Sequence, residues 1–196
     1  MFGQHTRVPE APIMAYGSLT FICGPMFGGK TTDLVRRILH ARRFARHGTH
    51  LVLKPAFDSR FGASRIATHE GLAVDAVAIT AMPDEARDVG EVFLDEVQFC
   101  VAPHYKGDVV EDIRDLLMCG VCVTASGLDM DSRGKPFEVS AALSAMADNL
   151  VKHRSWCSAC GNPATKSQRR AAGGDRLMLG EADLYEPRCN EHWSPA

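Results

Sequence analysis

The sequence has no long hydrophobic run. None of its segments approaches the roughly 20 apolar residues that a membrane-spanning helix requires, so no membrane partner is expected. Residues 1–16 lack an apolar run after a basic start, which argues against a secretory signal, and we expect a mobile N-terminal tail there. Aromatic residues are scarce, at 7%, and the formal net charge is only −2. A chain with this balance has no general attraction for nucleic acid or anionic lipid, and neither is expected as a partner.

Cysteine occurs seven times. An odd number without an export signal indicates a reducing compartment, so we expect a cytoplasmic protein without disulfides. Cys23, Cys119 and Cys122 lie in or beside apolar segments, where a free cysteine behaves as a small hydrophobic residue. With 196 residues, 45% of them hydrophobic and 23% charged, the chain can form one globular domain and a small appendage.

The most informative segment is a glycine-rich motif between a predicted strand, Leu19–Cys23, and a predicted helix, Thr32–His47. It fits the phosphate-binding pattern G-x-x-x-x-G-K-[ST] at every fixed position and consists of Gly24, Pro25, Met26, Phe27, Gly28, Gly29, Lys30 and Thr31. Backbone amides of such a loop, together with the helix N-terminus, bind nucleotide phosphates. We expect Lys30 to reach the β- and γ-phosphates of ATP and Thr31 to ligate Mg²⁺. The alternative is a strand-to-helix turn without a ligand.

Strands and helices alternate along most of the chain. After the strand Leu19–Cys23, further strands are predicted over 50–53, 74–79, 91–94 and 121–125. After the helix Thr32–His47, one helix is predicted to begin at Pro83, and two others are predicted over 108–118 and 138–150. Residues 55–70 and 126–137 are predicted loops. This pattern indicates an α/β fold with a mostly parallel sheet flanked by helices, similar to P-loop NTPases of the RecA-like type. We expect it to span residues 17–150, and a second small unit to span residues 151–196, where the periodicity fades.

An acidic pair, Asp95-Glu96, ends the predicted strand 91–94. In phosphate-loop proteins an aspartate at this place helps to hold Mg²⁺, so Asp95 is the candidate metal-side residue. The neighbouring Glu96 could accept a proton from an attacking hydroxyl, and it is the candidate general base. A solvated acidic turn is the alternative.

Two short motifs near the C-terminus have the spacing of a zinc site. Cys157 and Cys160 form one C-x-x-C pair, and Cys189 and His192 form a C-x-x-H pair. Zn²⁺ prefers four tetrahedral N and S ligands, and four protein ligands leave no position for water, so one structural zinc ion is expected. It would close the long loop between the pairs. Bare buried cysteines or a redox-active pair are the alternatives.

Taken together, these motifs resemble the cytosolic-type (type II) thymidine kinase family, from about Gly17 to Trp193. The resemblance also includes Asp-Glu-Val-Gln-Phe over 95–99, Gly-Leu-Asp over 127–129 and Lys-Pro-Phe over 135–137. It implies Mg²⁺-dependent transfer of the ATP γ-phosphate to the 5′-hydroxyl of thymidine, and also deoxyuridine, with Glu96 as the base. It further implies a zinc-bound lasso domain that covers the nucleoside.

The same resemblance assigns the remaining site residues. Val97 and Gln98 join Asp95, Glu96 and the phosphate loop as ATP-binding residues. The implied nucleoside and sugar contacts are Met26, Asp58, Arg60, Phe99, Leu128, Phe137, Ser167, Met178, Leu179, Gly180 and Tyr185. Thymidine triphosphate is implied as a feedback inhibitor, and a homotetramer or homodimer as the assembly.

Three positions depart from the family pattern. Gly28 stands where serine is common, which is harmless because that position contributes mainly backbone. Cys100 replaces a usual phenylalanine, and Ser132 stands where an aromatic residue commonly packs against the nucleoside. The last two changes remove apolar contact area, so a looser nucleoside pocket is expected.

Two other functions remain open at this stage. A nucleic-acid-dependent ATPase would use the basic residues near Lys166 and Arg169 to grip DNA or RNA, but the near-neutral charge argues against it. A regulatory nucleotide switch would hydrolyse ATP only to reset its conformation, and the acidic pair fits that role less well.

Overall fold

The computed structural model describes residues 15–44, 48–60, 62, 64–68, 71–170 and 184–195. The N-terminal tail predicted over residues 1–16 therefore lies, apart from Ala15 and Tyr16, outside the described residues. None of the helices in these described ranges combines the length and the apolar character that crossing a membrane would require.

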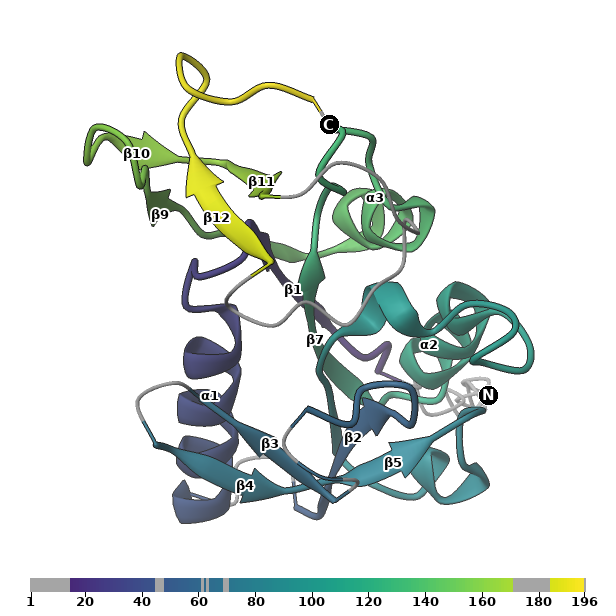
Figure 1. Ribbon diagram of the computed structural model, residues 1–196. Coiled ribbons are helices and arrows are strands. Elements are labelled where there is room, and N and C mark those ends of the chain that lie inside the picture. The colour runs from purple at the N-terminus through teal and green to yellow at the C-terminus, as the bar shows by residue number, and fades with distance from the viewer. Residues whose placement is uncertain are drawn as a thin grey trace, which may run out of the picture.

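A six-stranded parallel sheet forms the centre of the molecule, in the order β5-β2-β6-β7-β1-β8 (Figure 1). Its strands are β1 (Leu19–Gly24), β2 (His50–Pro55), β5 (Val77–Ile79), β6 (Glu91–Leu94), β7 (Cys122–Leu128) and β8 (Asn149–Lys152). The helices are α1 (Lys30–Phe44), α2 (Val109–Met118) and α3 (Glu138–Met146), with short 3₁₀ helices η1 (Asp84–Arg87) and η2 (Val97–Phe99). The predicted P-loop-like α/β fold is thus confirmed.

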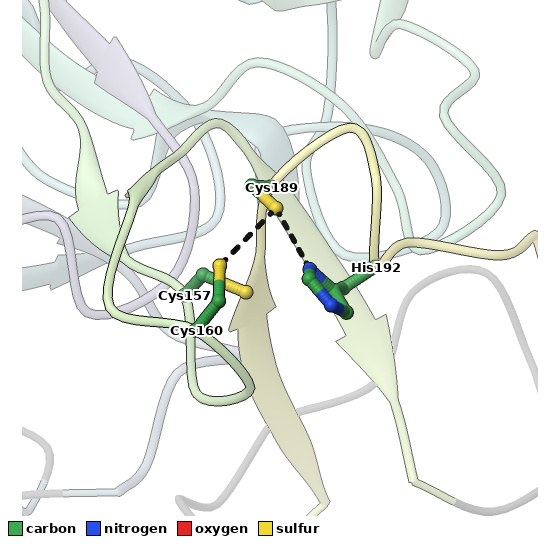
Figure 2. Close-up of side chains that lie close together, drawn as sticks. All are labelled: Cys157, Cys160, Cys189 and His192. Carbon is green, nitrogen blue, oxygen red and sulfur yellow. Dashed lines mark hydrogen bonds between the residues drawn. The ribbon is translucent and has the colours of Figure 1, made fainter.

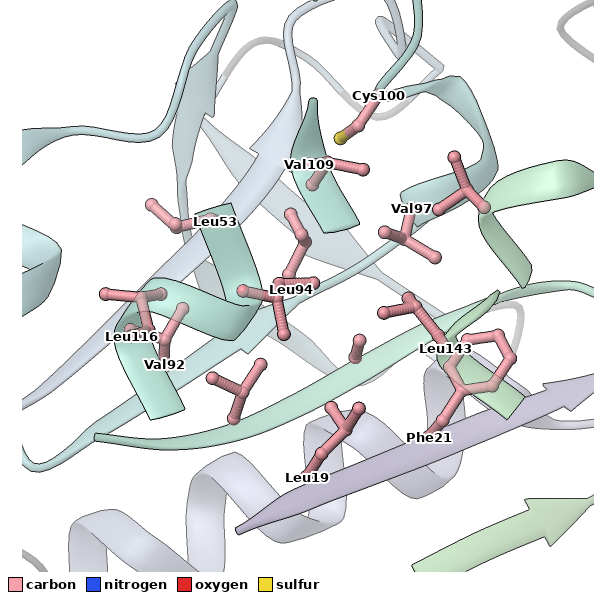
Figure 3. Close-up of a cluster of buried hydrophobic side chains, with 14 of the residues drawn as sticks. Leu19, Phe21, Leu53, Val92, Leu94, Val97, Cys100, Val109, Leu116 and Leu143 are labelled. Atoms are coloured by element: carbon pink, nitrogen blue, oxygen red, sulfur yellow. The ribbon is translucent and has the colours of Figure 1, made fainter. Parts of the chain in front are cut away.

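The helices cover both faces of the sheet because the central strands are apolar on both sides. On β1, Leu19 and Phe21 pack with α2 and α3, whereas Ile22 faces the opposite cluster with Leu34 and Ile38 of α1. Figure 3 shows the first cluster, in which side chains of the strands meet those of α2 and α3. Burial on both faces explains why the strands are continuous apolar runs rather than alternating ones.

The second, smaller part of the structure consists of short antiparallel strands. It contains the pairs β9 (Ser155–Trp156) with β10 (Pro163–Ala164) and β11 (Lys166–Arg169) with β12 (Tyr185–Arg188). These strands lie beyond the end of α1 where the phosphate loop is located (Figure 1). We call this part, residues 153–170 and 184–195, the zinc lobe, after the two motifs that are predicted to bind zinc.

Several predicted boundaries differ from the structure. The helix predicted over 138–150 ends at Met146, and Asn149–Lys152 instead form β8, which pairs with β1. The strand predicted over 74–79 is two strands in different sheets, β4 (Ala73–Asp75) and β5. The segment predicted as a loop, 55–70, contains β3 (Arg65–Ala67), which pairs with β4. The division into domains at residue 150 falls within β8 and stays a prediction.

Candidate active site

The glycine-rich segment forms a tight loop between the end of β1 and the start of α1. Gly24 and Gly29 have positive φ angles of 137° and 83°, which residues with side chains rarely adopt. The Gly28 amide donates to the Pro25 carbonyl at 3.3 Å, and the Asp33 amide donates to the Gly29 carbonyl at 3.0 Å. The loop therefore leads directly into a helix N-terminus, which is the geometry of an anion-binding site.

Lys30 is the first residue of α1 and is buried, with 8% of its surface exposed. Its Nζ donates to the Pro25 carbonyl at 2.8 Å. Burial lowers the pKa of Lys30, while the charges of Glu96 and Asp95 act in the opposite direction. The phosphate-loop lysine and the acidic pair thus interact within one site, although they are distant in the sequence.

The acidic pair lies at the carboxyl end of β6. Strand β7 separates β6 from β1, and Ser126 of β7 donates a hydrogen bond to the Asp95 carboxylate. Burial and the charge of Glu96 raise the pKa of Asp95 to about 6. Above that pH Asp95 is mostly ionised. The Thr31 hydroxyl and the Asp95 carboxylate are both hard oxygen donors, so the pair fits Mg²⁺ chemically.

Glu96 is positioned by its backbone and by two side chains. Its φ of 51° places it in the left-handed region, just before η2. Arg60 and Gln98 each donate a hydrogen bond to its carboxylate. Burial acts to raise the pKa of Glu96, but the charges of Arg60 and Lys30 outweigh it and lower the pKa. These charges therefore favour the ionised form of Glu96, the form that a general base requires.

Arg60 also belongs to a row of charged side chains that continues through Asp58 to Lys54. Arg60 Nε and Nη2 donate to the two oxygens of Asp58 at 2.7 and 3.2 Å. Lys54 Nζ lies 3.5 Å from Asp58 and donates to the carbonyls of Gly62 and Arg65 at 3.3 and 3.1 Å. Sequence reasoning missed Lys54, which is only 1% exposed. A lysine directly after an apolar strand was its one signal, because a buried charge needs partners.

Gln98 has a second role that the sequence did not indicate. Its side chain is 1% exposed, and its Oε1 accepts a hydrogen bond from the Leu128 amide at 3.0 Å. The same carboxamide donates to Glu96. Gln98 therefore ties the acidic pair to the end of β7. Val97, next to it, is fully buried.

The zinc lobe contacts the phosphate loop directly. Ser167 Oγ accepts from the Met26 amide at 3.0 Å, and Ser155 Oγ donates to the Phe27 carbonyl at 3.2 Å. Phe27 itself is exposed and has a φ of 61°. Among the predicted substrate contacts, Met26 and Ser167 are thus brought together by a hydrogen bond.

Among the other predicted nucleoside contacts, Phe99, Phe137 and Tyr185 are buried and Leu128 is partly buried. Phe99 packs on Phe57, with ring centroids 5.3 Å apart, and Leu128 ends β7. Phe137 precedes α3 and Tyr185 begins β12, where Arg169 lies over its ring at 5.8 Å. The roles of these residues at the nucleoside stay predictions. Met178, Leu179 and Gly180 lie outside the described residues.

The two cysteine-containing motifs come together at one point (Figure 2). The ligand atoms of Cys157, Cys160, Cys189 and His192 all lie within 4.8 Å of one another. Cys160 Sγ is 3.7 Å from Cys189 Sγ, and a tetrahedral zinc site with Zn–S bonds of about 2.3 Å separates its sulfurs by about 3.8 Å. This Cys₃His cluster could hold a zinc ion.

A comparison with family models places the chain. The family described as thymidine kinase matches residues 17–193, which is nearly the whole sequence. The chain belongs to the thymidine kinase family. The family membership supports thymidine phosphorylation as the general activity. In this kinase the lobe with the Cys₃His cluster contacts the phosphate loop, and the charges of the acidic pair act on Lys30 of that loop.

Proposed function

We propose that this kinase transfers the γ-phosphoryl group of ATP to the 5′-hydroxyl of thymidine, and of deoxyuridine, giving the nucleoside monophosphate and ADP. One observation carries the proposal. The Glu96 carboxylate is held ionised by Arg60 and interacts electrostatically with Lys30 of the phosphate loop. A base and a phosphate-binding lysine in one site suit transfer to a hydroxyl.

Phosphate binding, metal binding and proton transfer are assigned to different residues of the site. Lys30 exchanges its hydrogen bond with the Pro25 carbonyl for the β- and γ-phosphates, and loop amides bind the same oxygens. Thr31 and Asp95 would hold Mg²⁺, which when bound neutralises phosphate charge. Glu96 accepts the proton of the 5′-hydroxyl, the hydroxyl oxygen bonds to the γ-phosphorus, and the bond from that phosphorus to the ADP oxygen breaks.

The zinc lobe provides the cover over the nucleoside. Ser167 of β11 and Tyr185 of β12 would contact the nucleoside from one side, and Met26 of the phosphate loop and Leu128 at the end of β7 from the other. A covered site keeps water away from the γ-phosphate, so that transfer is favoured over hydrolysis. Zinc held by the Cys₃His cluster would fix the ends of β9 and β12, because its ligands follow those strands.

The experiment is separation of products from γ-labelled ATP incubated with thymidine, deoxyuridine or deoxycytidine. We expect label in the monophosphates of the first two. Glu96→Gln should lower kcat by about 10²–10⁴-fold with ATP binding retained. Glu111→Gln on α2 is the matched control, because Glu111 is exposed and pairs only with Arg114 among the described residues. If Glu96→Gln kept most of the wild-type turnover, Glu96 would not be the base.

Regulation, pathway, assembly and the effect of DNA are further proposals. Thymidine triphosphate should inhibit, because it carries both the base and the phosphates that the site binds. The kinase should act in pyrimidine deoxynucleotide salvage and DNA precursor synthesis in the cytoplasm. It should assemble as a homodimer or homotetramer, which a light-scattering mass would test. Added DNA should leave the rate of ATP turnover unchanged.

A further inference from the structure

One histidine connects the sheet, the phosphate loop and the first turn of α1. His153 follows β8, and its amide donates to the Cys23 carbonyl at 2.8 Å. This bond continues the pairing of β8 with β1 up to the start of the phosphate loop. The backbone of His153 is therefore fixed beside that loop.

His153 packs closely against three loop glycines. A methyl group on Gly24 would lie 2.6 Å from the His153 carbonyl oxygen, and one on Gly28 would lie 3.4 Å from its Cβ. A methyl group on Gly29 would lie 4.0 Å from its Nδ1. These distances show that His153 lies beside the loop at Gly24 and at the Gly28-Gly29 pair.

The imidazole reaches past the loop to α1. His153 Nε2 lies 3.1 Å from Asp33 Oδ2, and the Asp33 amide in turn donates to the Gly29 carbonyl. Burial opposes ionisation of Asp33, but hydrogen bonds from Arg37 and His153 lower its pKa. An ionised acceptor requires the proton on Nε2. Both side chains are about a quarter exposed, at 25% and 24%, so solvent only partly competes for the bond.

We propose that His153 is a positioning residue for nucleotide binding: by joining β8 to Asp33 across the phosphate loop, it fixes the loop against the start of α1. Its effect on ATP rests on the proposed function. The loop amides and Lys30 must point at the phosphates before the nucleotide arrives, and preorganisation of this kind raises affinity. Ser155 and Ser167 of the zinc lobe form hydrogen bonds with the phosphate loop itself. The His153 side chain, in contrast, also forms a hydrogen bond with α1, through Asp33.

The test compares three variants of the full chain. His153→Leu replaces the imidazole with a shorter apolar side chain and so removes the hydrogen bond, and His153→Gln restores a donor near the Nε2 position. His40→Leu is the matched control, because His40 lies on α1, is exposed and contacts Phe44 rather than the loop. For each protein we would measure the Kd for ATP, the KM for thymidine and the hydrogen exchange of amides 24–31 without nucleotide.

We expect His153→Leu to weaken ATP binding by about tenfold, as loss of one hydrogen bond to a charged group predicts. Loop amides should exchange faster in the same variant, the KM for thymidine should stay within about twofold, and His153→Gln should reverse both changes. Unchanged exchange and unchanged ATP affinity in His153→Leu would overturn the proposal. An equal rise in the Kd for ATP and in the KM for thymidine, not reversed in His153→Gln, would also overturn the proposal, because it would indicate a general structural role.

The exchange measurement separates this proposal from the proposed function. If the wild-type protein bound no ATP, the proposed function would fail, but loop amides would still report whether His153 fixes the loop. Faster exchange in His153→Leu alone would then support the positioning role. Exchange equal to that of wild type would refute it.

Discussion

Gly127→Ala should lower kcat by displacing the Gln98 side chain, although Gly127 is not among the residues predicted to bind the substrate. Gly127 lies on β7, and a methyl group added there would be 2.5 Å from Gln98 Oε1 and 2.9 Å from Val97 Cγ1. Ordinary contacts between such atoms are roughly 3.5 Å, so the carboxamide must move by about 1 Å. Gln98 would then lose its bond from the Leu128 amide or its bond to Glu96.

Two effects set the expected magnitude: steric overlap of the new methyl group with its neighbours, and loss of a hydrogen bond of Gln98. Overpacking of a buried site costs about 1–3 kcal/mol of unfolding free energy, which in a chain of this size lowers Tm by roughly 2–10 °C. A lost hydrogen bond to the charged Glu96 costs about 1.5–3 kcal/mol, and if it acts on the transition state kcat falls by about 10–100-fold. Steady-state thymidine phosphorylation and thermal unfolding measure the two effects separately.

A double-mutant cycle decides whether Gln98 transmits the effect. In a Gln98→Ala background the carboxamide that the new methyl group would displace is absent. Gly127→Ala should therefore lower kcat by less than about threefold in that background. Full additivity of the two substitutions would refute the reasoning. A Gly127→Ala enzyme with wild-type kcat would refute it too, because the carboxamide would then have room that the structure does not provide.

Other substitutions test the remaining parts of the site. Arg60→Met removes the main charge that lowers the pKa of Glu96, so that pKa should rise and the acidic limb of the kcat/KM profile should move to higher pH; a shift to lower pH would contradict this. Metal analysis should give about one zinc per chain, and Cys157→Ala or a chelator should lower Tm; zinc-free protein of unchanged Tm would exclude a structural metal. Ser132→Phe should lower the KM for thymidine by restoring apolar contact, and an unchanged or higher KM would mean that the loss is compensated elsewhere.

The sequence predicted the parts of the site that depend on local chemistry. The phosphate loop needs glycines at fixed positions before Lys30, and the zinc ligands need fixed spacings, so both leave motifs. The acidic pair was also evident, because charges that end an apolar strand stand out. The structure then brought Cys157 and His192 together as expected.

The parts that sequence reasoning missed depend on tertiary contacts. Leu150 continues the helical spacing of Leu143 and Met146 on α3, so periodicity extended the predicted helix to residue 150. Pairing with β1 makes residues 149–152 a strand instead. The roles of Gln98 and His153 have no motif, because they arise from neighbours distant in the sequence. Lys54 was passed over for the same reason.

The position of β8 has a consequence for attempts to divide the protein. Strand β1 carries the phosphate loop at its end and has β7 on one side and β8 on the other. Truncation before residue 149 would remove the partner of Thr20–Cys23 and leave β1 as an uncovered sheet margin of unpaired amides and carbonyls. Such a margin is prone to pair with other molecules. A cut at the predicted boundary after residue 150 would remove Val151 and Lys152 from β8, so we expect it to expose the same end of β1 beside the phosphate loop.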